Sequence, residues 1–197
     1  GIQYYHKSKL VPGVERMPYP GIFSFLELFA IDLGGISGSL GTQTERTVFT
    51  NDSGWGVAPV ICYESIYGDY VADYIRNGAN VIFIVTNDGW WGNTPGHRQH
   101  LQYASLRAIE TRKDIARSAN TGISAFIDQK GMIHQATSYW VPAVIRQDVL
   151  FNDYTTFYIR YGDIIGRVCI LLAIVTLLIT IISKFTGNFY FRRSKMR

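Results

Sequence analysis

The chain has 197 residues, of which 47% are hydrophobic and 17% are charged. This length is enough for one globular domain with its own core, but the charged fraction is below the roughly one quarter typical of soluble domains. The formal net charge is +4, and five positive charges lie together at the C-terminal end, at Lys184, Arg192, Arg193, Lys195 and Arg197. The rest of the chain is therefore close to neutral, which argues against a nucleic acid as its partner.

The first third of the chain contains loops and a predicted hairpin. Residues 4–20 include three prolines and a glycine, so we expect an extended loop there after a short strand. Residues 22–33 are strongly apolar with two acids, which indicates a short helix or a membrane-facing loop. We expect residues 47–49 and 56–62 to form paired strands around a turn at 51–54.

The middle of the chain alternates between strand and helix patterns. After residue 62, apolar residues recur at helical spacing up to a stop signal at Gly78. Residues 81–86, VIFIVT, form a continuous run that is typical of a strand buried on both faces. This alternation predicts an α/β domain with helices covering a sheet. The further expected elements are a helix at 97–112, strands at 115–118, 123–128 and 132–136, and a strand at 144–150 that closes the sheet.

A long apolar segment follows the α/β pattern. Residues 164–183 contain a single charge, Arg167, and a helix of about 20 residues spans roughly the 30 Å hydrocarbon core of a bilayer. A buried core helix is the alternative, but such helices are seldom apolar on all sides. We therefore expect a catalytic domain at 1–160, a transmembrane helix at 161–184 and a basic tail at 185–197.

The basic tail also predicts orientation. Positive residues after a membrane span mark the cytoplasmic side, so the preceding domain is expected on the opposite side, which in a bacterium is the periplasm. The chain opens with Gly1 and carries no signal peptide. Because a periplasmic domain needs an upstream segment that directs it there, we expect a portion of a longer protein whose N-terminal part is missing.

Cys62 is the candidate nucleophile. The other cysteine, Cys169, lies in the expected span, so Cys62 is predicted to be a free thiol in an oxidising compartment. A small buried hydrophobic residue is the alternative. However, Cys62 is expected at a strand-to-helix elbow, where a helix N-terminus favours the reactive thiolate. The backbone N–H of Tyr63 is then placed to hold an oxyanion.

Other polar signals are weaker when each is taken alone. Lys7 and Glu15 are separated by eight residues, and residues of these types are ordinarily solvated. Asn87 opens the string Asn-Asp-Gly-Trp-Trp-Gly, which leaves the apolar strand at its carboxyl end, where α/β sheets usually place their sites. A tryptophan pair such as Trp90 and Trp91 is more often core packing than a substrate contact.

An ordered set of motifs over nearly the whole chain resembles a known family. The chain resembles the C-terminal half of the bacterial apolipoprotein N-acyltransferases, membrane members of the nitrilase or carbon–nitrogen hydrolase superfamily. The matching strings are Tyr5-His6-Lys7, Leu10-Val11-Pro12, Glu15, Ile61-Cys62-Tyr63-Glu64, Asn87-Asp88-Gly89-Trp90-Trp91-Gly92, Gln99-His100-Leu101, Arg107-Ala108-Ile109-Glu110-Thr111, Asn120-Thr121-Gly122-Ile123-Ser124 and Arg160-Tyr161-Gly162-Asp163.

The resemblance implies a four-layer α-β-β-α sandwich, present here in part, and a Glu–Lys–Cys triad without metal or cofactor. Cys62 matches the nucleophile and Lys7 the triad lysine. Glu15 and Glu64 match two further acids that line the site, and Trp90 lies in the loop implied to cover it. The triad glutamate, which is the general base, is expected upstream of this chain.

The resemblance also implies a reaction and its partners. Cys62 would take an acyl chain from a membrane phospholipid as a thioester and pass it to the N-terminal amine of a diacylglyceryl-modified apolipoprotein, at the bacterial inner membrane. The first alternative is a membrane-tethered amidase that uses water as acceptor. The second is a non-catalytic shell that serves as a membrane interaction module.

Overall fold

The computed structural model describes residues 1–11, 15 and 42–194. The chain divides into two compact units, Gly1–Arg160 and Tyr161–Arg197. The apolar stretch at 22–33, and with it the expected helix or membrane-facing loop, lies outside the described residues. Residues 1–11 contain no strand, so the short strand expected before the first loop is wrong. The Gln3 side chain instead attaches this segment to the sheet, because it bonds both the N–H and the carbonyl of Thr50.

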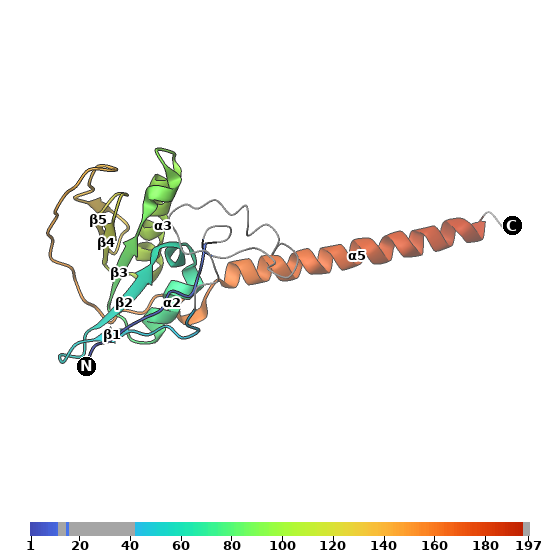
Figure 1. The fold of residues 1–197 in the computed structure, drawn as a ribbon. Helices are drawn as coiled ribbons and strands as arrows, with labels where there is room; N and C mark the ends of the chain where they lie inside the picture. The colour runs from blue at the N-terminus through green and yellow to red at the C-terminus, as the bar shows by residue number, and fades with distance from the viewer. Residues whose placement is uncertain (12–14, 16–41, 195–197) are drawn as a thin grey trace. The chain divides into compact units, whose positions relative to one another are not determined.

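A mixed sheet forms the centre of the first unit (Figure 1). Its strands follow in the order β1-β2-β3-β4-β5-β6. β2, β3 and β4 run parallel, and the other pairs are antiparallel. The strands are β1 (Phe49–Thr50), β2 (Gly56–Ile61), β3 (Val81–Thr86), β4 (Ile115–Ala119), β5 (Ala125–Ile127) and β6 (Ile133–His134).

The helices pack against one face of this sheet. α2 and α3 contact each other, and they contact β2 and β5 respectively. The α/β prediction and the expected order of these helices and strands are confirmed, with shorter strands at the sheet edge. The described helices of this unit are η2 (Cys62–Ile66), α2 (Gly68–Arg76), η3 (Asp88–Trp91), α3 (Gly96–Thr111) and α4 (Phe157–Tyr161). The buried core between helices and sheet includes Ala58, Val60, Tyr70, Val71, Tyr74, Ile82, Ile84, Leu101, Ala104, Ala108, Ile115 and Ile127.

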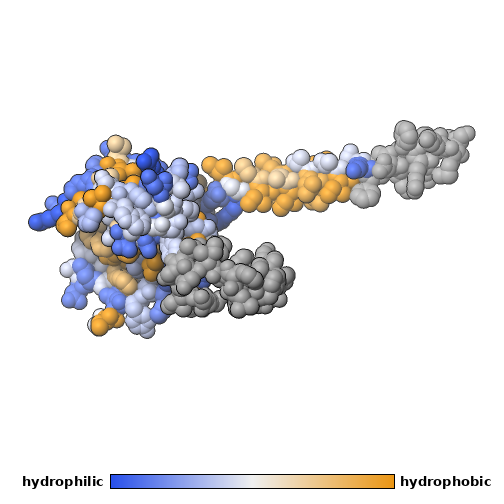
Figure 2. All heavy atoms as spheres, turned by 45° about the horizontal axis from the view of Figure 1, so that its top comes forward, coloured by the Kyte–Doolittle hydropathy of each residue, from blue (hydrophilic) through white to orange (hydrophobic). Residues whose placement is uncertain are grey.

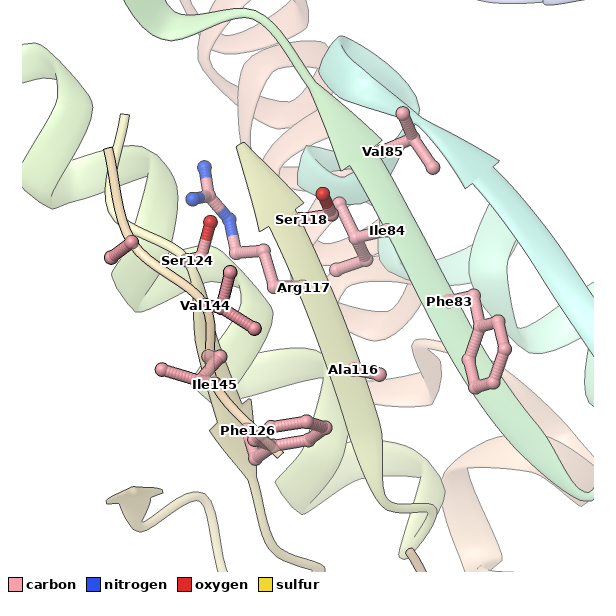
Figure 3. A pocket seen from close by; sticks show the side chains of 11 residues that line it. Phe83, Ile84, Val85, Ala116, Arg117, Ser118, Ser124, Phe126, Val144 and Ile145 are labelled. Atoms are coloured by element: carbon pink, nitrogen blue, oxygen red, sulfur yellow. The ribbon is translucent and has the colours of Figure 1, made fainter. Parts of the chain in front are cut away.

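The opposite face of the sheet is apolar and open. In β3, Ile82 and Ile84 are buried, but Phe83 is 39% exposed and Val85 is 59% exposed. The expectation that this strand is buried on both faces is therefore wrong for the described residues. Successive side chains of a strand point to opposite faces, and the described helices cover one face alone. Figure 3 shows Phe83 and Val85 on the open face, together with Phe126 of β5.

The strand expected at 144–150 is absent from the structure. β6 ends at His134, and Gln135 has a positive φ of 52°, which breaks the extended conformation. The later segment meets the sheet region through isolated contacts, such as the bond from Leu150 N–H to the Asp114 carboxylate at 2.8 Å. Val144 and Ile145 instead help to line a hollow over the open face of β3, β4 and β5 (Figure 3).

The second unit contains the helix α5 (Ile164–Ser194). Its segment Ile164–Lys184 is 21 residues long, has a mean hydropathy of 2.7 and is not buried against other described residues. Figure 2 shows hydrophobic side chains along this helix. Length and composition therefore make it one candidate membrane span, as expected.

Candidate active site

Cys62 lies at a sharp turn between strand and helix. β2 ends at Ile61 and η2 begins at Cys62, whose φ of 51° lies in the left-handed region. A non-glycine residue in that region is strained, and such residues cluster at functional sites. Cys62 is a free, half-buried cysteine. The expected elbow is thus present, although the element that follows is a short 3-10 helix and α2 begins only at Gly68, which weakens the argument from a long helix dipole.

Cys62 opens into a cavity of about 400 Å³. This cavity gathers five residues predicted from the sequence, which come from an N-terminal loop, from η2 and from the loop after β3. Three residues without a predicted role complete it. The lining residues are Val11, Glu15, Cys62, Tyr63, Asn87, Trp90, Trp91 and His100.

Lys7 reaches this cavity through Glu15. The Lys7 ammonium lies 2.7 Å and 2.6 Å from the two Glu15 carboxylate oxygens, and the two side chains are 13% and 26% exposed. Glu15 also accepts the backbone N–H of Val11 at 2.8 Å. The pair is therefore held in place at the cavity wall, which disfavours the solvated-surface interpretation of either residue.

Glu64 has a different place from the one expected. Its side chain is fully buried, and it is not among the residues that line the cavity. One carboxylate oxygen accepts the Ile61 N–H at 2.8 Å, and the other accepts the Ser8 N–H at 2.6 Å and the Tyr5 hydroxyl at 2.7 Å. Glu64 thus joins the end of β2 to the segment that contains Lys7.

Tyrosine hydroxyls complete the surroundings of Glu64. Tyr70 donates to the same carboxylate oxygen at 3.1 Å and also contacts the Tyr5 hydroxyl. Burial raises the pKa of Tyr5 and of Tyr70, so both stay protonated near neutral pH and can act as donors. The buried Glu64 carboxylate therefore has hydrogen-bond donors at both of its oxygens.

A second buried network contacts the backbone carbonyl of Cys62 through His100. The Asp88 carboxylate faces the His100 Nδ1 at 2.8 Å and the Arg117 guanidinium at 2.7 Å, and it accepts the Thr86 hydroxyl at 3.0 Å. Although burial alone would raise the pKa of Asp88, the contacts with His100 and Arg117 lower it to about 2. Gly122 is required here, because a Cβ at this position would collide with the Asp88 side chain.

The loop after β3 is tied to the rest of the site. Asn87 accepts the Thr121 hydroxyl at 3.0 Å and the Gly89 N–H at 3.2 Å, which fixes the side chain that lines the cavity. Trp90 and Trp91 are 41% and 42% exposed. Their partial exposure at the cavity wall contradicts the core-packing interpretation of the pair, and it leaves apolar surface available to a substrate.

Asp88, His100 and Arg117 were not predicted as site residues. Asp88 and His100 belong to strings that carry the family resemblance, but a polar residue in a helix or loop is usually solvated, so sequence alone gave them no role. A usable signal was the position of Asp88 at the carboxyl end of a parallel strand. Within the described ranges, no cluster of three or more His, Cys, Asp or Glu side chains is arranged to hold a metal ion.

Comparison with known proteins agrees with this architecture. The carbon–nitrogen hydrolase profile matches residues 1–157, and the chain belongs to this family. It is 40% identical to the apolipoprotein N-acyltransferase of Chlorobaculum tepidum, over 93% of this chain and 35% of the relative. It is 32% identical to that of Thermotoga maritima, over 89% of this chain and 34% of the relative. The chain thus spans about a third of the length of these curated relatives.

The solved structures that match part of the chain include two from the nitrilase superfamily. The amidase from Nesterenkonia sp. AN1 is 16% identical with a TM-score of 0.42, over 52% of this chain and 41% of that protein. Saccharomyces cerevisiae Nit3 is 17% identical with a TM-score of 0.43, over 52% of this chain and 40% of that protein.

Proposed function

We propose that these residues form the C-terminal part of an acyltransferase that moves a fatty acyl chain from a phospholipid to the N-terminal amine of a diacylglyceryl-modified lipoprotein. One observation carries the proposal. The Cys62 thiol occupies a strained elbow and shares a cavity with Glu15, the partner of Lys7, and with the half-exposed Trp90 and Trp91. Similarity to proteins named apolipoprotein N-acyltransferase supports the same activity.

The proposed reaction has two steps. A glutamate upstream of these residues, in the longer parent chain, takes the proton of Cys62, and the thiolate attacks the ester carbonyl of the phospholipid. The ester C–O bond breaks, the lysophospholipid leaves with the proton, and a thioester remains on Cys62. The lipoprotein amine then attacks the thioester, the C–S bond breaks, the proton that the amine loses passes to the Cys62 sulfur, and an amide forms. Covalent catalysis divides one difficult transfer into two easier steps.

The charged residues at the cavity would stabilise the transition states. The negative charge that develops on the carbonyl oxygen needs hydrogen-bond donors or a cation nearby. The backbone N–H of Tyr63 and the Lys7 ammonium are the candidates, and Glu15 holds the ammonium in position. Neither group takes up the thiol proton, so the upstream base remains necessary.

The apolar surfaces favour lipid substrates over small polar amides. Val11, Trp90 and Trp91 contribute apolar surface to the cavity, and the segment Ile164–Lys184 is long enough to hold the enzyme in a bilayer. We propose that the parent chain is anchored in a bacterial inner membrane, with Cys62 on the periplasmic side. A membrane-tethered amidase that uses water would share the thiol and the Lys7–Glu15 pair, and it is the alternative.

The acceptor distinguishes the two functions. The parent chain is incorporated into vesicles that contain a phospholipid with a labelled acyl chain and a diacylglyceryl-cysteine peptide. We expect the label in an amide on the peptide, and no transfer by the Cys62→Ser variant, because a hydroxyl is far less ionised than a thiol. Label found only as free fatty acid would overturn the acyltransferase proposal in favour of hydrolysis.

A further inference from the structure

Tyr5 and Tyr70 meet from segments that are far apart in the sequence. Tyr5 lies in the N-terminal segment, two residues before Lys7, and Tyr70 lies in α2, where it is 3% exposed. Their hydroxyls contact each other. Each also donates to the same Glu64 carboxylate oxygen, Tyr5 at 2.7 Å and Tyr70 at 3.1 Å. The two hydroxyls and the fully buried Glu64 carboxylate therefore form one polar cluster.

This cluster holds the chain on both sides of Lys7. Before Lys7, the bond comes from the Tyr5 hydroxyl, and after it the Ser8 N–H donates to the same Glu64 oxygen at 2.6 Å. The other Glu64 oxygen accepts the N–H of Ile61 at 2.8 Å. Ile61 is the residue directly before the candidate nucleophile, so the cluster connects the lysine segment to the elbow.

The link through Tyr70 does not depend on a choice of proton positions. A tyrosine hydroxyl has one proton, and the acceptors near the Tyr70 hydroxyl are the Glu64 oxygen and the Tyr5 hydroxyl. Whichever of them Tyr70 uses, it bonds α2 to a group that holds the Lys7 segment. Packing directs both hydroxyls, because both rings stand edge-on against the ring of Tyr74, with 5.8 Å and 5.7 Å between centroids.

We propose that Tyr5 and Tyr70 are positioning residues that set the place of the Lys7 ammonium beside the nucleophile. Residues 1–11 form no helix or strand, so no backbone ladder holds the lysine segment against the elbow, and the polar cluster supplies the link. Such placement matters because a shift of a catalytic group by about 1 Å can cost a hundredfold in rate. The proposal rests on the proposed function only in taking Lys7 and Cys62 as the catalytic pair.

The rate of Cys62 acylation tests the proposal. Single-turnover acylation with labelled phospholipid is measured in the membrane-bound parent chain for Tyr5→Phe and Tyr70→Phe, which remove a hydroxyl and keep the ring. Each should lower the rate at saturating phospholipid about tenfold, the upper end for one lost hydrogen bond, and leave the half-saturating concentration unchanged. Wild-type rates in both variants would overturn the proposal.

Tyr74 provides the matched control for the two tyrosines. It belongs to the same group of rings, but its buried hydroxyl has no hydrogen-bond partner among the described residues. Tyr74→Phe should therefore acylate at the wild-type rate. An equal decrease in Tyr74→Phe would assign the effect to ring packing and overturn the proposal.

A double-mutant cycle separates the positioning of Lys7 from a general structural effect. When Lys7 is already replaced by alanine, no ammonium is left to position, so Tyr70→Phe should cause no further decrease in the rate. A further tenfold decrease in the Lys7→Ala background would show that Tyr70 does not act through Lys7, and would overturn the proposal.

Amide hydrogen exchange tests the positioning without any substrate. On the peptide that contains Lys7, exchange should be faster in Tyr5→Phe and Tyr70→Phe than in the wild type and Tyr74→Phe, because a weaker attachment lets the segment open more often. Equal exchange in all four proteins would overturn the proposal. Acylation of Cys62 precedes both transfer and hydrolysis, so label found only as free fatty acid would overturn the proposed function and leave the result on the tyrosines intact.

Discussion

Among single residues, Lys7 allows a direct test of electrostatic catalysis. If its ammonium stabilises the oxyanion, Lys7→Ala should lower the rate of Cys62 acylation about a hundredfold or more, as loss of an oxyanion donor typically does. Lys7→Arg should restore the rate only in part, because a planar guanidinium does not replace a compact ammonium. Single-turnover acylation with labelled phospholipid measures both variants.

Lys9 provides the matched control for Lys7. It belongs to the same segment, and its ammonium lies over the ring of Tyr67, 5.5 Å from the centroid, instead of beside Glu15. Lys9→Ala should therefore acylate at a rate close to that of the wild type. An equal decrease of the acylation rate in Lys7→Ala and Lys9→Ala would show that Lys7 has a structural role and not a catalytic one.

Asp88 predicts a dependence of stability on acid pH. Its pKa of about 2 in the folded protein lies below the roughly 3.9 of a free aspartate. Its stabilising contribution, about 2 kcal/mol, is therefore fully present above about pH 4 and is lost as the pH falls toward 2. Thermal unfolding should show Asp88→Asn less stable than wild type near pH 7, with the difference shrinking across that window.

An exposed carboxylate is the control for Asp88. Asp52 lies exposed in the turn between β1 and β2, so Asp52→Asn should match the wild type in stability at pH 7 and at pH 2. A difference between Asp88→Asn and the wild type that stays constant from pH 7 to pH 2 would contradict the assignment of an ionised Asp88.

The outcomes at Glu64 and His100 show what sequence reveals about a site. The sequence predicts the position of Cys62, because a strand pattern ends there and a helical pattern follows it, and both are local signals. The direction of the Glu64 carboxylate was not, because it depends on Tyr5 and Ser8, more than fifty residues away. The contacts of His100 with Asp88 and with the Cys62 carbonyl depend in the same way on the packing of distant segments.

Secondary-structure elements show the same division between local and non-local information. The sequence predicts β3 with its bounds, since five apolar residues and a threonine before a turn leave little choice of conformation. The strand expected at 144–150 does not form, because a strand needs a neighbouring strand to pair with. The edge strand β6 has already ended at His134, where Gln135 adopts a positive φ. The open face of β3 was also misjudged, because an apolar side chain does not indicate which element covers it.

That open face leads to a prediction for the sheet. The sandwich expected from the family resemblance places a second sheet over Phe83 and Val85, which line a hollow of about 340 Å³. In the parent chain, Phe83→Ala should then cost roughly 3–5 kcal/mol, as for a buried phenylalanine. In residues 1–197 alone the loss should be much smaller, and this portion should aggregate through its open surface. Thermal unfolding in detergent compares the two.

Val60 is the control for the covered face. It is fully buried against the helices, so Val60→Ala should destabilise the parent chain and residues 1–197 to a similar extent. If Phe83→Ala also lowered the unfolding temperature equally in both, the face would not be covered in the parent, and the sandwich would be wrong.

At the scale of the whole molecule, the distribution of charge predicts topology. The basic residues after the apolar segment, from Lys184 onward, should be cytoplasmic, and Cys62 should lie on the far side of the membrane. Cysteines introduced at Arg193 and at the exposed Asp52 can be labelled in intact cells with an impermeant reagent. We expect labelling at 52 and none at 193. The reverse pattern would invert the topology and exclude a periplasmic acyltransferase.

The central claim is that Cys62 carries the acyl group. The parent chain is mixed with phospholipid in the absence of an acceptor peptide, and the intact protein and its peptides are analysed by mass spectrometry. We predict one added acyl chain on the peptide that contains Cys62. Hydroxylamine should remove this acyl chain, as it does from a thioester, and addition of the acceptor amine should remove it too. An acyl group on another residue, or stoichiometric transfer by Cys62→Ser, would contradict the account.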